Sequence, residues 1–473
     1  MPDILVISDD VAGARMAGPG IRAWELARRL AADFRTTLAV PEYSPGTTGG
    51  EPGGGAPPFE LMRYAVGRPA ALRDEARNSR IVLIQGYVLS KFPFLKDIPA
   101  FLVCDLYVPF PLENLFVHRR GGMSPRQREA VHLHDLSVFN DQIVHGDHFL
   151  CANERQRDLI LGALLALDRI DPRAVEDSPA LDGLVNVVPF GIEESEAPSQ
   201  HAQKPALRGV VPGIGREDIV FLWGGVLCNW FDPLTLIRAV ERAAGKNPAI
   251  KLVFLSTGHP NPLLAGFEAA SDAVALSDEL GLTGRYVFFN RDWVEYARRG
   301  AFFRDADVGV SIHDLHIETR FAFRTRILDY LKFDLPILCT EGDSLADLVR
   351  ERCLGRVVPC GDVGRLAEAM LELAGGDGGL RREFRENIAG VRPEFTWKKT
   401  AAPLVDVCRR VFDGRVVKRS KPSRRTLSAV TAGRNPGAVE RAVRGRMWFL
   451  AQKLPIGVRA RLRGILKGAG RRP

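Results

Sequence analysis

VGVSIHDLHIETRFAFRTRILDYLKFDLPILCTEG, residues 308–342, places a charged, helix-forming stretch between two short apolar runs. The runs at 308–313 and 335–342 are rich in Val, Ile and Leu and show no strict alternation with polar residues. Such runs are typical of strands that are buried on both faces of a parallel sheet. The segment therefore predicts a strand, a helix and a second strand of an α/β domain.

The stretch between the two runs carries a cluster of charges. Arg324 and Arg326 lie in its middle, and Asp329 follows Arg326 by three residues, so that Arg326 and Asp329 share one helix face. Ligands of open α/β sheets sit beyond the carboxyl ends of the strands, which places the arginines to bind phosphate oxygens and the carboxylate to accept from ribose hydroxyls. The pattern favours a nucleoside diphosphate site, with a solvated helix face of ordinary ion pairs as the alternative.

The same alternation of apolar runs with helical patterns extends along the chain. Candidate strands lie at 4–8, 36–40, 81–85, 100–107, 148–153 and 185–190 in the first half, and at 218–225, 251–258, 286–291, 308–313, 335–342 and 355–362 in the second. Two such series in tandem predict an α/β protein of two Rossmann-like domains with parallel sheets. We expect domains at 1–190 and 191–400, a terminal helix at 401–414 and a tail at 415–473.

The composition is that of a globular protein. The 473 residues are 46% hydrophobic and 26% charged, and no apolar run approaches the roughly 18 residues that a membrane-spanning helix needs. The chain opens on the apolar run ILVIS (4–8), with no basic segment and cleavable apolar core before it, from which we expect a cytoplasmic protein. The seven cysteines are scattered and form no C-x-x-C pair, so neither a disulfide framework nor a zinc site is predicted.

Three segments carry a resemblance to a known family. They are GPGIRAWELARRLA (18–31), NVVPFGI (186–192) and TRILDYLKFDLPIL (325–338). In order, they resemble the glycine-rich turn before the first helix, the hinge strand that enters the donor domain, and the K-l-x-E-Y-l-a-x-G-x-P-v motif of the group 1, or family 4, glycosyltransferases of the GT-B fold. In the third segment Asp329 stands for the motif's Glu and Arg326 for its Lys. The resemblance implies two domains that face one another across a cleft.

The chain departs from that family pattern at two places. Members often carry two glutamates seven residues apart, but the position that would pair with Asp329 is Phe321, and Glu318 lies eleven residues before Asp329. Members also place Arg and Lys after the first strand of the donor domain, where this chain reads WGGVLCNWFDPL (223–234) without a cation. Positive charge for a diphosphate must then come from the arginines at 320, 324 and 326 and from backbone amides.

The donor-binding candidates include glycines. Gly18 and Gly20 flank a proline at the start of a predicted helix, where exposed N–H groups attract anions, although a glycine there is as often only a tight turn. Gly224 and Gly225 follow an apolar run and let the backbone approach a ligand closely. The resemblance implies that Arg324 and Arg326 hold the diphosphate and that Asp329 contacts the ribose.

Three further candidates are each open to two interpretations. Asp105 ends an apolar run of the first domain and is expected to point into the cleft, toward the acceptor or the transferred sugar. Glu318 accepts from sugar hydroxyls or only pairs with Arg320. Trp293 stacks on the nucleobase or packs in the core, and we favour the core. We take Arg326, Glu318 and Asp105 as the catalytic candidates.

Several patterns that look functional are set aside. Asp305-Ala306-Asp307 has the spacing of a manganese-binding D-x-D pair, but it precedes a predicted strand instead of ending one, and we interpret it as a helix end. The histidine pairs at 313/316 and 145/148 lack cysteines or acids at matching spacing, so no metal site is predicted. Neither G-x-x-x-x-G-K-[ST] nor G-x-S-x-G occurs, which disfavours a P-loop ATPase or kinase and the simplest hydrolases.

The tail is strongly basic. From Arg415 to Pro473 it holds 17 Lys and Arg residues against one acid, Glu440, whereas the chain before it is acidic on balance. Residues 437–472 show two apolar stripes at helical spacing surrounded by arginines, which is typical of helices that lie on an anionic membrane surface. Nucleic-acid binding and packing of the tail on the acidic body are the alternatives, and we favour the membrane.

Together these features predict a cytoplasmic, peripherally membrane-bound glycosyltransferase. The resemblance implies transfer of a sugar from a nucleoside diphosphate donor to a glycan or lipid-linked acceptor, with retention of configuration and with neither metal nor other cofactor. The alternatives are a nucleotide-sugar epimerase or phosphorylase of the same fold, or a non-catalytic scaffold whose tail recruits a membrane or nucleic acid.

Overall fold

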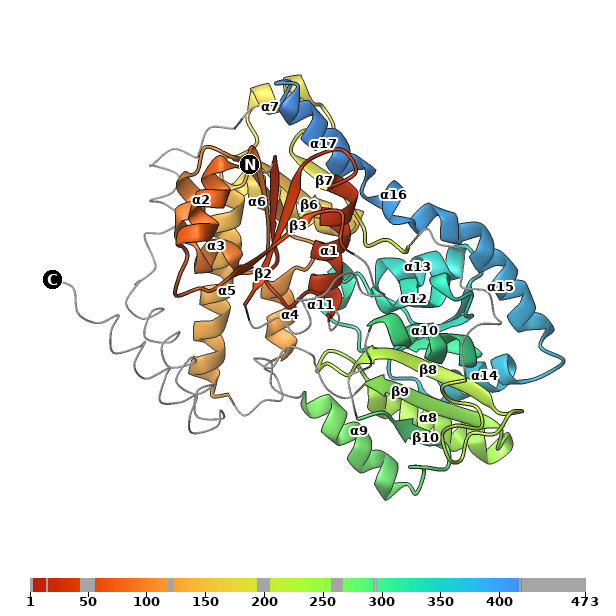
Figure 1. Ribbon diagram of the computed structural model, residues 1–473. Helices are drawn as coiled ribbons and strands as arrows, with labels where there is room; N and C mark the ends of the chain where they lie inside the picture. The colour runs from red at the N-terminus through yellow and green to blue at the C-terminus, as the bar shows by residue number, and fades with distance from the viewer. Residues whose placement is uncertain are drawn as a thin grey trace.

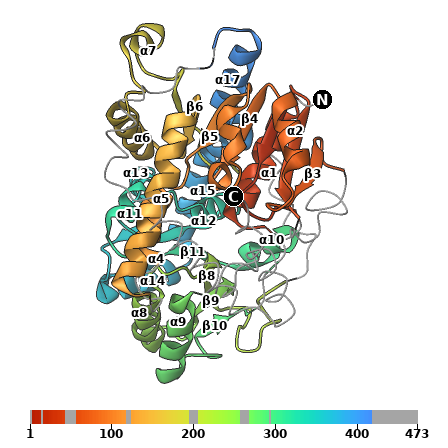
Figure 2. The same cartoon turned by 90° about the vertical axis from the view of Figure 1, so that its left-hand side faces the viewer.

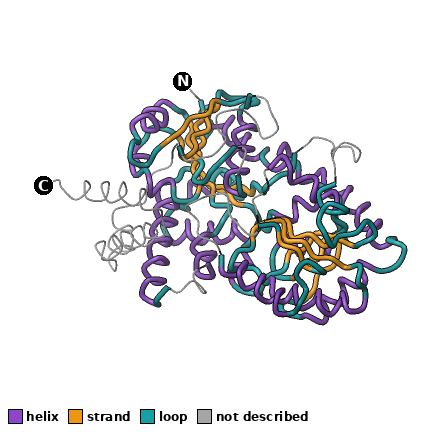
Figure 3. Tube along the Cα trace, turned by 60° about the horizontal axis from the view of Figure 1, so that its bottom comes forward, coloured by secondary structure: helices purple, strands orange, loops and turns teal. Residues whose placement is uncertain are grey.

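The computed structural model describes residues 3–13, 16–42, 56–117, 123–193, 205–256, 267–291, 294, 296–416 and 418. These residues form two parallel sheets, one of seven strands and one of six, with helices packed around each (Figures 1 and 3). The first sheet is complete before residue 190 and the second begins after residue 218, so each is built from a continuous part of the chain. The predicted architecture of two tandem Rossmann-like domains is confirmed.

The first sheet has the strand order β3-β2-β1-β4-β5-β6-β7, and all of its neighbouring pairs are parallel. The strand β3 was not predicted, because it lies at the sheet edge, is partly exposed and reads ELMRY without an apolar run. The strands are β1 (Ile4–Ile7), β2 (Thr36–Pro41), β3 (Glu60–Tyr64), β4 (Ile81–Gln85), β5 (Phe101–Asp105), β6 (His148–Cys151) and β7 (Val185–Val187).

Two helices of the first domain, α5 and α6, begin with capping side chains. Asn153 accepts a hydrogen bond from the backbone of Gln156 at the start of α6, and Ser124 and Gln127 form a capping box at the start of α5. The helices are α1 (Gly18–Leu30), α2 (Ala70–Asn78), α3 (Val88–Lys91), α4 (Phe110–Val117), α5 (Pro125–His145), α6 (Glu154–Ala166) and α7 (Pro172–Asp177), with a 3-10 turn at Pro93–Asp97.

The second sheet has the order β10-β9-β8-β11-β12-β13 and is also parallel throughout. Its strands are β8 (Ile219–Val226), β9 (Ile250–Ser256), β10 (Val287–Phe289), β11 (Val308–Ser311), β12 (Ile337–Thr340) and β13 (Gly355–Val358). Its helices are α8 (Pro233–Lys246), α9 (Glu268–Glu279), α10 (Tyr296–Asp305), α11 (Ile317–Phe321), α12 (Arg326–Lys332), α13 (Ser344–Glu351), α14 (Val363–Ala374) and α15 (Gly379–Val391).

Both sheets reverse direction at one point. The chain runs outward from β1 to β3 and then returns to β4 on the other side of β1, and the second sheet reverses in the same way between β8 and β11. Ligands of open α/β sheets bind at such switch points, beyond the carboxyl ends of the strands. The topology therefore points to the loops after β1 and β4 in the first domain and after β8 and β11 in the second.

The chain crosses between the domains twice, along neighbouring paths. After β7, Ile192 exchanges backbone hydrogen bonds with Phe395 and Trp397, at 2.7 and 3.1 Å. The helices α16 (Trp397–Thr400) and α17 (Ala402–Phe412) then lead back to the first domain, as the blue ribbon shows (Figure 1). There the Arg80 side chain donates to the carbonyl of Phe412 at 2.9 Å.

Two predictions fall on parts of the chain that are not described. The basic segment 437–472 and Trp293 both lie outside the described residues. Lys418, which is described, donates to the Ile98 carbonyl of the first domain at 2.6 Å. Within the described residues no helix is long and apolar enough to span a bilayer.

Candidate active site

A cavity of about 400 Å³ lies between the two domains. Its first-domain wall comes from the start of α1, the loop after β5 and the first turn of α4, and the hinge residues 190–193 close one side. The second domain contributes the loop after β8 and the segment from α11 to α12. The charged side chains in its lining are Asp10, Glu113, Glu193, Arg299, Glu318, Arg324, Arg326, Asp329 and Lys332.

The two glycines after the apolar part of β8 have different roles. A Cβ atom on Gly224 would lie 2.7 Å from the Phe303 ring, so this glycine allows the strand to pack closely against α10. A Cβ atom on Gly225 would lie 3.6 Å from an Nη atom of Arg326. Gly225 therefore lies beside the Arg326 guanidinium, and its role in donor binding stays a prediction.

Arg326 is held by aromatic rings and a carbonyl. Its guanidinium carbon lies 3.9 Å from the centre of the Phe231 ring and 4.3 Å from that of Trp223, and Nη2 donates to the Val226 carbonyl at 3.2 Å. Nη1 is buried without a hydrogen-bond partner among the described residues. Burial lowers the pKa of Arg326 to about 10, so the group stays cationic at neutral pH. The site thus presents a fixed positive charge with an unused donor.

Arg324 is committed to a carboxylate instead. Its two terminal nitrogens donate to the two carboxylate oxygens of Glu318 at 2.9 and 2.7 Å, and both side chains are almost fully buried. The alternative pairing of Glu318 with Arg320 is not found. Both residues line the cavity, so Glu318 stays available to a sugar. Arg324 holds Glu318 in place, and because its charge is already neutralised, it brings no free positive charge to a phosphate.

Two cations that the sequence did not indicate complete this wall. Arg299, from α10, lies 2.7 Å from a carboxylate oxygen of Asp329, and Lys332 lies 2.7 Å from Glu193 of the hinge. Local spacing gave no signal for Arg299, because α10 reaches α12 only through the packing of the sheet. Asp329, expected at the ribose, faces the cavity with Arg299 bound to it.

Asp105 does not point into the cavity. Its carboxylate accepts from Nε and Nη2 of Arg22 at 2.7 and 2.8 Å and from Gln85 at 3.1 Å, and neither side chain of the ion pair is exposed. The Arg22 guanidinium also lies 4.8 Å from the Tyr107 ring. The expected cleft-facing position is corrected: Asp105 ends β5 as predicted, but a buried arginine of α1 covers its carboxylate.

The two glycines of α1 also separate. Gly18 lines the cavity, and a Cβ atom there would meet nothing within 4 Å. A Cβ atom on Gly20 would lie 2.0 Å from the Val11 carbonyl oxygen, and Gly20 is not part of the lining. Gly18 keeps its predicted place at the site, whereas Gly20 allows α1 to pack against the loop after β1.

Asp305 and Asp307 of the D-x-D sequence hold the chain together at the end of α10, as their position before a strand predicted. Asp305 ends α10 and accepts from the backbone amides of Ala206 and Leu207, both at 2.7 Å. Asp307 forms an ion pair with Arg208 and accepts from the Val220 amide at 2.8 Å. No cluster of three or more metal-binding side chains occurs within the described parts of the chain.

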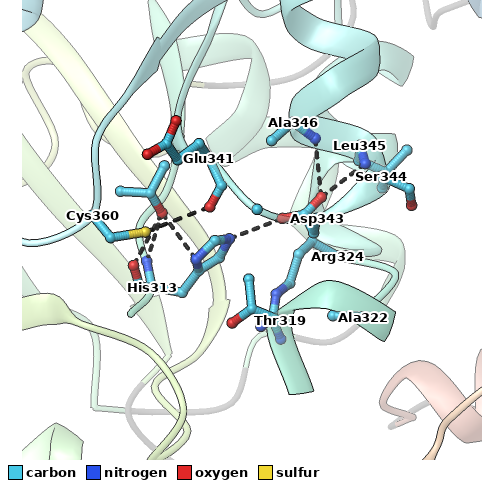
Figure 4. Close-up of polar contacts among 12 residues, drawn as sticks. His313, Thr319, Ala322, Arg324, Glu341, Asp343, Ser344, Leu345, Ala346 and Cys360 are labelled. Carbon is cyan, nitrogen blue, oxygen red and sulfur yellow. Dashed lines mark hydrogen bonds and ion pairs between the residues drawn. The ribbon is translucent and has the colours of Figure 1, made fainter. Parts of the chain in front are cut away.

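A buried network joins the ends of β11 and β12 to the start of α13 (Figure 4). The ring of His313, just after β11, lies 2.8 Å from Asp343 through Nε2 and 3.0 Å from Thr340 through Nδ1. Burial alone would raise the pKa of Asp343, but its hydrogen bond and charge interaction with His313 hold the pKa below its ordinary value. Asp343 also accepts from two backbone amides at the start of α13. The network fixes the ends of β11 and β12 beside the cavity.

Neither protein-family models nor curated proteins match this chain. Solved structures do match. Sucrose-phosphate synthase from Thermosynechococcus elongatus is 14% identical over 87% of this chain and 99% of its own, with a TM-score of 0.57. WaaG, a glycosyltransferase involved in lipopolysaccharide biosynthesis, is 14% identical over 85% and 98%, with a TM-score of 0.57. HepE from Anabaena, in complex with UDP-glucose, is 12% identical over 88% and 99%, with a TM-score of 0.60.

The matched proteins span both domains of the chain and almost all of their own length. At this identity the likeness concerns the fold. The chain has the GT-B fold, as its sequence resemblance predicted.

Proposed function

We propose that this GT-B chain is a glycosyltransferase that moves a sugar from a nucleoside diphosphate sugar to a hydroxyl group of a glycan or lipid-linked acceptor. The observation that carries the proposal is Arg326, a fixed cation in the interdomain cavity with a buried, unused donor on Nη1. HepE, which shares the fold, has been solved with UDP-glucose, and such a donor has the diphosphate that this cation would bind.

The charges of the cavity support an anionic ligand beside Arg326. Three of its cations are paired with carboxylates: Arg324 with Glu318, Arg299 with Asp329, and Lys332 with Glu193. Arg326 alone among the described cations of the lining has no such partner. A diphosphate placed next to it would neutralise the charge and fill the open side of Gly225.

The site residues then take the following roles in the transfer. The bond between the anomeric carbon and the diphosphate oxygen breaks, and a bond from that carbon to the acceptor oxygen forms. Arg326 stabilises the negative charge that develops on the leaving diphosphate, which can take up the proton of the acceptor hydroxyl on the same face of the sugar. Glu318 accepts from the sugar hydroxyls. Asp329, oriented by Arg299, accepts from the ribose.

This scheme is a retaining reaction and uses neither a metal ion nor an organic cofactor, since a guanidinium supplies the positive charge. Asp105 has no part in it, because its carboxylate is covered by Arg22.

The proposal is tested first by binding and turnover. UDP, GDP, ADP and dTDP are compared by thermal shift, because a ligand that binds only the folded state raises its melting temperature. Hydrolysis of the matching nucleotide sugar without acceptor is then measured for the wild type and for Arg326→Ala. We expect slow hydrolysis that falls at least a hundredfold in Arg326→Ala, as for loss of a group that stabilises the transition state. Arg238→Ala, on the exposed face of α8, is the control.

The outcomes separate the alternatives. Unchanged hydrolysis in Arg326→Ala would refute the role of Arg326. A scaffold would show no hydrolysis at all, and an epimerase would interconvert the sugar while leaving it attached to the nucleotide.

We further propose that residues 437–472 bring the enzyme to an anionic membrane surface on the cytoplasmic side, where a lipid-linked acceptor would be met. Sedimentation with vesicles that contain anionic lipid, compared with a chain that ends at residue 418, tests this. Equal binding of the two chains, or tail-dependent binding of nucleic acid in preference to vesicles, would contradict it.

A further inference from the structure

Glu113 is a carboxyl group of the cavity that the scheme above does not use. It lies in the first turn of α4, on the first-domain wall, and lines the cavity with Glu318 and Arg324 of the second domain. Its side chain forms no hydrogen bond and no ion pair within the described residues. Each of the other described carboxyl groups that line the cavity forms at least one such contact. Glu113 is partly exposed and lines the cavity, so its carboxyl group is free to bind a ligand there.

The packing of α4 brings Glu113 to the second domain. Phe116, one turn later on α4, stacks on the ring of His316 at 3.8 Å between centroids and 16° between planes. Residues three apart share a helix face, so Glu113 faces the same side as Phe116. The α4 and α11 ribbons lie next to one another at the domain boundary (Figure 2). Glu113 therefore stands across the boundary from the Glu318–Arg324 pair.

The surrounding charges do not neutralise an ionised Glu113. Arg324 is engaged by Glu318, whose negative charge acts against a second one nearby. Burial lowers the pKa of His316 to about 4, so this ring is uncharged at neutral pH. Cys228 and Tyr107, which also lie within electrostatic range of Glu113, stay protonated because burial raises their pKa values. On α5, the Asp135 carboxylate is bound by Tyr87 and Asn114.

We propose that Glu113 binds the nucleotide sugar as a neutral carboxylic acid. Donor binding then requires a proton on Glu113. Where the free protein has lost this proton, binding takes up one proton from the solvent. The inference rests on the proposed function. The protonated group donates one hydrogen bond to a sugar hydroxyl or phosphate oxygen, which an ionised carboxylate cannot do. The ionised form would add negative charge beside the diphosphate and Glu318.

The electrostatics support this assignment. Burial, followed by the charge of Glu318, raises the pKa of Glu113 to about 8. Glu318 and Glu113 thus form a pair of cavity carboxyl groups in different surroundings: Arg324 binds Glu318, and Glu113 has no cation bound to it within the described residues. Such a difference within a pair is a common arrangement at reactive sites.

The test measures proton uptake in the whole chain. UDP-glucose, GDP-mannose, ADP-glucose and dTDP-glucose are titrated by calorimetry at pH 7, 8 and 9, in two buffers of different ionisation enthalpy. The sugar-linked diphosphate has no proton of its own to lose in this range. For a group of pKa about 8, we expect uptake of about half a proton at pH 8 and nearly one at pH 9, with Kd rising about tenfold between pH 7 and 9.

Two variants identify the group that titrates. Glu113→Gln keeps a hydrogen-bond donor without the ionisation, and we expect a Kd that no longer depends on pH and no proton uptake. Glu129→Gln makes the same chemical change on the exposed start of α5 in the same domain, away from the cavity, and should behave as the wild type.

The outcomes distinguish this inference from the proposed function. Binding without proton uptake in the wild type, or an unchanged pH dependence in Glu113→Gln, would overturn the role of Glu113 and leave the glycosyltransferase proposal standing. If none of the four nucleotide sugars binds at any pH, the proposed function fails and the inference falls with it. The wild-type titration decides the matter even if Glu113→Gln does not fold.

Discussion

Gln156 of the first domain donates from its side-chain amide to the backbone carbonyl of Phe321 in the second, at 2.8 Å. The same amide donates to Tyr107 of its own domain at 2.9 Å, and the residue is 1% exposed. Phe321 ends α11, between Glu318 and Arg324. The start of α6 thus holds the very segment that carries the charged side chains of the site.

Neighbouring residues of α6 strengthen this contact. Asn153 donates to the Ala322 carbonyl at 3.2 Å, and Arg155 donates to the Gly342 carbonyl at 2.8 Å and pairs with Asp347 at 2.5 Å. In Figure 2 the helices α6, α11 and α13 form one group at the domain boundary. Closure of the cleft and the position of the α11–α12 segment are therefore coupled through these bonds.

We expect Gln156→Ala to weaken donor binding although Gln156 does not line the cavity. Two buried carbonyls lose their donor, at a cost of about 1–3 kcal/mol, which we expect to appear as a lower melting temperature and a raised KM for the donor with a smaller change in kcat. Kinetics over a range of donor concentration measure the split. Asp158→Ala, on the exposed face of α6, is the control, and an unchanged KM in Gln156→Ala would show that the contact does not position the site.

We expect Asp105→Asn to destabilise the first domain. The variant leaves the Arg22 guanidinium buried without its counter-ion, a loss of about 3–5 kcal/mol in the free energy of unfolding. Urea denaturation measures this directly. Asp33→Asn, whose partner Arg409 is well exposed, should change stability by less than about 1 kcal/mol. If Asp105→Asn instead kept full stability and lost turnover, the original prediction of a catalytic Asp105 would be restored.

The two glycines of α1 provide a matched pair. Gly20→Ala places a methyl group 2.0 Å from the Val11 carbonyl oxygen, so the loop after β1 must move, and we expect a loss of about 1–3 kcal/mol. Gly18→Ala meets no atom within 4 Å and should leave the free energy of unfolding the same or slightly higher. Thermal denaturation of the two variants is sufficient, and equal destabilisation would contradict the assignment.

Glu113 should also leave a signature in stability without ligand. Its folded pKa of about 8 lies above the ordinary value of 4.5, so the unfolded chain releases this proton first as the pH rises. The unfolded state then binds fewer protons than the folded state, and the free energy of unfolding falls between about pH 4.5 and 8. Glu113→Gln has no ionisable group at this position, so its free energy of unfolding does not fall in this way. The difference in the free energy of unfolding between the variant and the wild type should therefore rise between about pH 4.5 and 8 and stay level above pH 8. A difference that stays constant with pH would contradict the raised pKa.

The sequence predicted more of the fold than of the site. Of the strands in the described parts of the chain, twelve were indicated by apolar runs and β3 was not, because an edge strand needs no apolar run. Arg326, Glu318 and Asp329 line the cavity, and the sequence singled them out because they follow one another in the charged segment after β11. Their roles in donor binding and catalysis stay predictions. Asp105 was read correctly as the end of a strand, but the direction of its carboxylate depends on Arg22, which lies 83 residues away in the chain.

By itself the sequence determined the two parallel sheets, because burial on both faces demands apolar runs that are visible locally. Only the tertiary structure decided which charges are neutralised. It pairs Arg324 with Glu318 and Arg299 with Asp329, places Arg326 between two aromatic rings, and gives Glu113 no partner among the residues that the structure describes. An ion pair depends on a few ångströms between side chains from distant segments, and that distance is set by how the two domains meet and not by the spacing of residues along the chain.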